Sequence, residues 1–120
     1  MSRIQVDPAM RAVIAECAVR YPEVLASVVS VPHAPKEFAV GVLRNGVTPR
    51  GGLPACGCFL GTMAAFLGVS GTKEIAEVLR MRWETVSDAM VWCITPARDR
   101  AACAYAETVF QGMLDAGVTP

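Results

Sequence analysis

The sequence predicts an all-α fold, a compact single domain of five to six helices that takes in residues 1–120. Apolar residues recur at spacings of three and four along several segments, which is the pattern of a helix that buries one face. The pairs Asp7-Pro8 and Thr95-Pro96 are typical helix starts, because the first residue caps free amide groups and proline is tolerated at the first helical position. With 53% hydrophobic and 18% charged residues, the chain has enough apolar surface to bury a core without disulfides or metals.

The N-terminal part begins with an amphipathic helix over residues 8–21. Pro22 is expected to end or kink this helix. The segment 23–31 stays open between two structures, because its apolar spacing fits a helix and its β-branched residues also suit a strand. Two prolines then predict a loop over 32–35, followed by a short helix over 36–44 that Asn-Gly ends.

The middle of the chain carries no charge from Gly51 to Thr72. We expect a central apolar helix here, rich in glycine and alanine, which Pro54 opens and Gly68 closes. Its strongly apolar part is about 15 residues long, whereas a membrane-spanning helix needs about 20. The segment is therefore interpreted as a buried helix, and no membrane contact is expected.

The last third of the chain predicts three more helices. Thr72 is expected to cap a helix over 73–81, and a second short helix follows over 83–93. The long final helix starts at Pro96 and is stopped by Gly117.

Small residues repeat at a spacing of four on the central helix, at Gly57, Gly61 and Ala65. They give the helix a smooth face that another helix backbone can approach closely. The partner on this face is either another helix of the same chain or a second copy, so the residues mark a packing or oligomer face.

Residues 72–90 follow the pattern of a helix-turn-helix, in which two short helices meet at a tight turn. The positions expected inside the pair or beside its turn are all apolar: Ile75, Ala76, Leu79, Met81, Val86 and Ala89. The candidate DNA-binding residues are Arg80, Arg82, Trp83, Thr85 and Ser87.

Two features of this segment disfavour nucleic acid. Arg80 stands where such motifs usually carry glycine, because the turn favours a positive φ. Between Thr72 and Arg100 five basic residues are balanced by five acidic ones, so the segment lacks the excess positive charge that drives binding to phosphates. We therefore favour a structural pair of helices over a DNA-binding one.

A second candidate ligand site precedes the central helix. Arg44, Arg50, Gly51 and Gly52 combine two cations with flexible backbone N–H donors before a helix N-terminus, which favours a small anion. The segment lacks the lysine-containing glycine motif of a nucleotide-binding P-loop.

Neither an enzyme nor a metal protein is expected. The only histidine, His33, lies between two prolines and beside no recognisable nucleophile motif. The five cysteines are odd in number and irregularly spaced, which argues against a disulfide framework and favours buried free thiols in a reducing cytoplasm. A four-thiolate zinc site is disfavoured by the ligand spacing; its members would be Cys56, Cys58, Cys93 and Cys103. No cofactor is expected, and the N-terminus has no apolar secretory segment.

Three fragments occur in a suggestive order: Arg20-Tyr21-Pro22-Glu23 after an amphipathic helix, the stretch Ala55–Thr62 at the start of an apolar helix, and Ile75–Leu79 before a closing helix. This order resembles small uncharacterised Cys/Gly-motif helical proteins of actinobacteria and their phages. The resemblance implies a compact helical fold and no catalytic residues, and in that group the helix pair looks structural.

The sequence as a whole favours a small non-enzymatic helical protein that acts through protein–protein interaction or homo-oligomerisation, and the resemblance extends this to a phage-encoded protein. The first alternative is a helix-turn-helix regulator that binds DNA through residues 72–93. The second alternative is a protein that binds a small anionic ligand.

Overall fold

The computed structural model describes residues 4–30 and 58–120, and the regular elements of this part of the chain are all α-helices. This confirms the predicted all-α class. The helices in order are α1 (Pro8–Arg20), α2 (Pro22–Ser30), α3 (Phe59–Leu67), α4 (Thr72–Leu79), α5 (Trp83–Trp92) and α6 (Pro96–Asp115). The loop expected over 32–35 and the helix expected over 36–44 lie outside the described residues.

The first two helices are separated by a single residue. The carboxylate of Asp7 accepts a hydrogen bond from the amide of Ala9 at 3.0 Å, which gives α1 the expected N-terminal cap. Pro22 ends α1 and begins α2, as its fixed φ and missing N–H allow at a first helical position. The ambiguous segment 23–31 is helical as far as Ser30, because the helical period brings Leu25 and Val28 into the core together.

The central apolar helix starts later than its sequence predicts. It begins at Phe59, since Cys58 before it is extended and acts as the N-cap, with its Sγ accepting from the amide of Gly61 at 3.4 Å. Pro54 is therefore not its first residue. Its end is as predicted, because Gly68 adopts the left-handed conformation that closes the helix. Five of its nine residues are buried.

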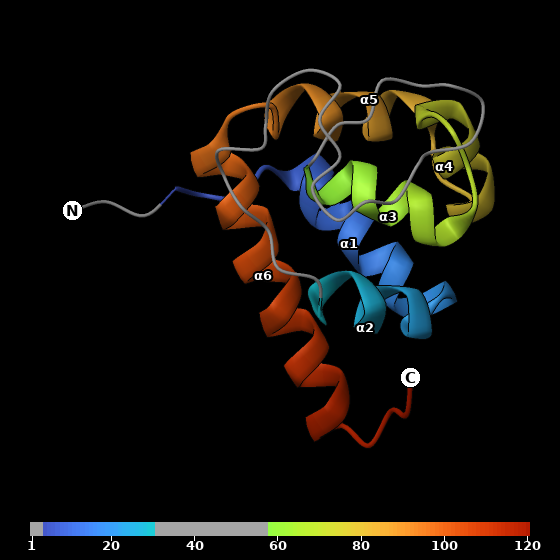
Figure 1. Cartoon of the computed structure of the whole chain (residues 1–120), viewed down its shortest axis with the longest axis vertical. Helices are drawn as coiled ribbons and strands as arrows, with labels where there is room; N and C mark the ends of the chain where they lie inside the picture. Colours follow the sequence, from blue (N-terminus) through green and yellow to red (C-terminus); the bar gives the residue numbers. More distant parts are fainter. Residues whose placement is uncertain (1–3, 31–57) are drawn as a thin grey trace.

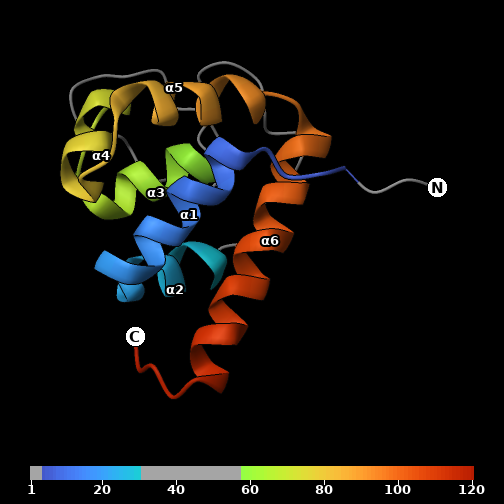
Figure 2. The ribbon, with the colours of Figure 1, turned by 180° about the vertical axis from the view of Figure 1, so that it is seen from behind.

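Helix α1 packs against four of the other described helices. It contacts α5 most extensively, and also α2, α4 and α6, as Figures 1 and 2 show from opposite sides. Its contribution to the core comes from four buried residues at helical spacing: Met10, Val13, Ile14 and Cys17. Helix α6 is the longest and runs along one side, where Ala102 and Ala106 turn inward.

A buried acid joins α6 to α3. Asp99 is only 1% exposed, and its Oδ1 accepts a hydrogen bond from the backbone N–H of Phe59 at 2.7 Å. Phe59 is the first residue of α3, so the carboxyl group satisfies an amide that the helix itself leaves without a partner. A negative group at this end also interacts favourably with the helix dipole.

Replacing this acid is expected to destabilise the fold. Asp99→Ala leaves the buried amide of Phe59 without its acceptor, so we expect the free energy of unfolding to fall by about 1–3 kcal/mol. Urea denaturation followed by circular dichroism measures this change. Asp99→Asn keeps an oxygen acceptor and should lose less, and Asp88→Ala, at an exposed acid, serves as the control. Equal stability of the two alanine variants would contradict the assigned role.

Candidate functional site

The predicted helix-turn-helix segment folds as two short helices joined by three residues, α4 and α5 with 80–82 between them. One predicted detail is wrong, because the N-cap of α4 is Gly71 and Thr72 is its first helical residue. The hydroxyl of Thr72 instead accepts a hydrogen bond from Nε1 of Trp83 at 3.1 Å. Thr72 thus ties the start of α4 to the start of α5.

The two helices pack as their apolar pattern predicts. The residues buried in them are Ile75, Ala76 and Leu79 of α4 and Val86 and Ala89 of α5. Helix α1 packs against both helices, so the pair is one wall of the core.

The turn adopts the left-handed geometry in spite of its sequence. Arg80 has φ 54° and ψ 49°, and it is the one non-glycine residue with positive φ in the described part of the chain. The amide of Met81 bonds to the carbonyl of Ala76 at 2.8 Å, which closes the end of α4. The same closure follows Gly68 at the end of α3, where glycine takes the left-handed position without strain.

A residue of α1 holds this turn from outside. Nε of Arg20 donates to the carbonyl of Leu79, the last residue of α4, at 3.0 Å, and also to Glu16 at 3.2 Å. A guanidinium at a helix C-terminus satisfies a free carbonyl and interacts favourably with the negative end of the helix dipole. Packing and hydrogen bonds together therefore impose the turn that Arg80 alone disfavours.

The five candidate DNA-binding residues lie in the turn between α4 and α5 and in the first half of α5, and they are not equally exposed. Arg80, Arg82 and Trp83 are exposed, whereas Thr85 and Ser87 are half-buried. Two of the exposed groups already have partners. Arg82 pairs with Glu84 at 3.7 Å, and the ammonium of Lys73 lies 5.4 Å from the centre of the Trp83 ring.

The outward face of α5, defined here by Trp83 and Val91 of the helix and Ile94 in the turn after it, with the acids Glu84 and Asp88, is apolar and acidic. Its three apolar side chains are 45%, 64% and 57% exposed, in that order. Helix α5 carries two acids and no basic residue.

Sequence reasoning missed Val91 and Ile94 as surface residues. The signal that marks Val91 is its position on the helix, offset from the buried set, whereas Ile94 lies in the turn after α5.

Only some residues of the other predicted sites lie in the described part of the chain. Gly61 and Ala65 lie half-buried on α3, and Gly57 is outside the described residues. The whole anion-binding set, Arg44, Arg50, Gly51 and Gly52, also lies outside them, as does His33.

Three of the four described cysteines are outside disulfides. Cys17 and Cys93 are buried free thiols, as predicted, and Cys103 is half-buried and outside any disulfide. Burial, reinforced by Glu23 near Cys17 and by Asp99 near Cys93, raises the pKa of each buried thiol from 9.0 to about 12. Both therefore remain protonated at neutral pH, which makes them poor nucleophiles and metal ligands.

Cys58 departs from the prediction of free thiols, because it is disulfide-bonded. Within residues 4–30 and 58–120, no group of three or more His, Cys, Asp or Glu side chains is arranged to hold a metal ion.

The sequence matches no protein-family model, and neither the curated proteins nor the solved structures contain a similar one. Among the described helices, none combines the length and the apolar character needed to cross a bilayer.

Glycine at position 80 is expected to stabilise the protein. A non-glycine residue in the left-handed region costs about 1–2 kcal/mol, and Arg80→Gly removes this cost while it adds freedom to the unfolded chain. We expect a net increase of about 0.5–1 kcal/mol in the free energy of unfolding, measured by urea denaturation.

The control is Glu77→Gly, at an exposed residue within α4 whose φ is not positive. Glycine there relieves no strain and should lower stability. If both glycine variants shifted stability in the same direction and by the same amount, the strain assigned to Arg80 would be refuted.

Proposed function

We propose that this protein is a non-enzymatic helical domain that acts through protein–protein contact, either with a second copy or with another protein, by the outward face of α5. The observation that carries the proposal is the exposure of three large apolar side chains: Trp83 at the start of α5, Val91 near its end and Ile94 in the turn that follows. Large apolar side chains that gather on a surface mark contact sites more often than isolated ones do. Tryptophan is also among the residues that contribute most to binding energy at interfaces.

The charges around this face favour a protein over a nucleic acid as the partner. A helix that enters a DNA groove approaches phosphates, yet α5 presents Glu84 and Asp88 and carries no basic residue. Of the exposed cations beside Trp83, Arg82 is paired with Glu84 and Lys73 lies against the ring of Trp83. Association through apolar side chains does not require positive charge.

DNA binding is a second candidate, and a specific observation supports it. The turn at Arg80 takes the left-handed conformation of a helix-turn-helix, and Trp83 remains exposed at the start of the second helix. These features keep the first turn of α5 accessible, as recognition by such motifs requires. Against it stand the two acids of α5.

Self-association tests the leading proposal directly. We expect the wild-type chain to form oligomers as its concentration rises in sedimentation equilibrium. Val91→Glu should weaken this association at least about tenfold, because it places a charge in an apolar contact. Val19→Glu, at a valine of α1 that is even more exposed than Val91, is the matched control and should associate like wild type. A chain that stays monomeric up to millimolar concentration would exclude self-association, and the remaining form of the proposal would be contact with another protein.

A salt titration tests the second candidate. A helix-turn-helix regulator should bind a labelled duplex DNA at 50 mM salt, with an affinity that falls steeply as salt rises. Arg82→Gln should reduce the slope of that dependence by about one if this side chain contacts a phosphate. We expect no binding above background, and a steep slope that depends on Arg82 would replace the protein-contact proposal with a DNA-binding one.

A further inference from the structure

A groove lies on the opposite side of α6 from the core, between this helix and the segment that precedes α1. It has a volume of about 1010 Å³ and is open to solvent along its length. The segment before α1 crosses α6 near its N-terminal end (Figures 1 and 2). The lining residues are Ile4, Gln5, Val6, Arg11, Ala97, Arg100, Ala101, Ala104, Tyr105, Glu107, Thr108 and Gln111.

The groove has an apolar floor and a positive end. The floor is formed by the small side chains of three alanines of α6 at helical spacing, Ala97, Ala101 and Ala104. Ile4 and Val6 form an apolar wall. Two guanidinium groups face the same space, Arg11 from α1 and Arg100 from α6. The one acid in the lining is Glu107, which is nearly two helical turns further along α6.

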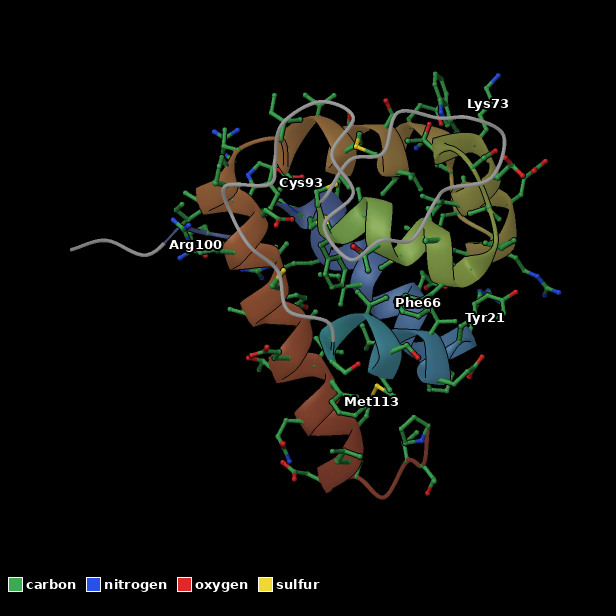
Figure 3. All side chains as sticks on the ribbon, in the orientation of Figure 1. Tyr21, Phe66, Lys73, Cys93, Arg100 and Met113 are labelled. Atoms are coloured by element: carbon green, nitrogen blue, oxygen red, sulfur yellow. The ribbon has the colours of Figure 1, made fainter. Side chains whose placement is uncertain are left out.

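The two arginines differ in how they are held. The guanidinium of Arg11 lies 5.6 Å from the centre of the Tyr105 ring and donates to Oε1 of Gln5 at 3.3 Å, and these two contacts orient it. Arg100 is exposed (Figure 3), and among the described residues neither arginine makes an ion pair. A preorganised cation beside a second exposed one is suited to bind carboxylates, which guanidinium groups recognise with paired hydrogen bonds.

The dimensions favour a chain segment over a small molecule. A site for a small ligand buries most of its surface, whereas most of the side chains that line this groove are exposed. From residue 97 to residue 111 the helix rises about 21 Å, which is the length of roughly six residues of extended peptide. An extended peptide also places alternate side chains on opposite sides, so that acidic ones can meet the arginines while apolar ones lie on the alanines.

We propose that this groove binds an extended acidic segment of a partner protein, whose carboxylates meet Arg11 and Arg100 and whose apolar side chains lie on the alanine floor. This surface is separate from the outward face of α5, so the proposal goes beyond the protein contact described above.

Fluorescence anisotropy with the full chain tests the proposal. The probe is a labelled six-residue peptide that alternates leucine and glutamate, and its control replaces each glutamate with glutamine. We expect the acidic peptide to bind at least about tenfold more tightly at 50 mM salt. Arg100→Gln should weaken its binding about three- to tenfold, and Glu107→Gln, which removes the one acid of the lining, should strengthen it about twofold.

Matched variants separate the groove from general electrostatics. Arg82→Gln removes the same charge outside the groove and should leave binding within about twofold of wild type. Val91→Glu should also leave it unchanged, so a failure here is distinct from a failure at α5. Circular dichroism confirms that each variant is folded.

Three results would overturn the proposal. The acidic peptide binding no more tightly than the glutamine peptide would remove the role of the carboxylates. If Arg100→Gln and Arg82→Gln weakened binding of the acidic peptide equally, the attraction would be non-specific. Displacement of the peptide by equimolar inorganic phosphate, or by an oligothymidylate, would assign the groove to a simple anion or to nucleic acid.

Discussion

The hydrogen bond between the carboxyl group of Asp99 and the amide of Phe59 is the constraint on which the arrangement of the helices depends. It joins two helix starts that are 40 residues apart in sequence, and it does so inside the core. A buried polar group is tolerated only when it is paired, so α6 has to bring Asp99 to the N-terminus of α3, where the amide of Phe59 donates to it. This directional hydrogen bond therefore sets where α6 lies relative to α3, in addition to the apolar contacts of the core. Apolar burial alone would permit many sliding positions of a helix along its neighbour.

Most helix boundaries of the described part of the chain could be predicted from local chemistry. Asp7 and Thr95 cap their helices as their side chains allow, and Gly68 and Gly117 end theirs with positive φ. The prediction is wrong where a tertiary contact helps to set the boundary of a helix. The start of α3 is at Phe59, where Cys58 and Asp99 cap it. The Cys58 contact is local but comes from a residue that is not among the preferred N-caps, and the Asp99 contact spans 40 residues of sequence. Asp99 in particular reads as a surface acid in the sequence, because nothing near it in the chain shows that it is buried.

The candidate sites show the same limit. The buried pattern of α4 and α5 was visible, since helical periodicity reports which residues face inward. The exposure of Val91 and Ile94 was not, because an apolar residue in a sequence reads as core unless its neighbours in space are known. The groove beside α6 depends on Arg11 and Arg100, which are far apart in sequence and meet only through the packing of α1 against α6.

The central place of α1 has a consequence for synthesis of the protein. Its main packing partner, α5, begins about sixty residues after α1 ends. At a translation rate of roughly 5–20 residues per second, α5 is made about 3–13 seconds later. During that interval the face formed by Met10, Val13, Ile14 and Cys17 lacks the surface that will cover it. A nascent chain of this protein therefore displays an apolar helix early, and chaperones that bind exposed apolar segments have a defined period in which to engage it before the fold can close.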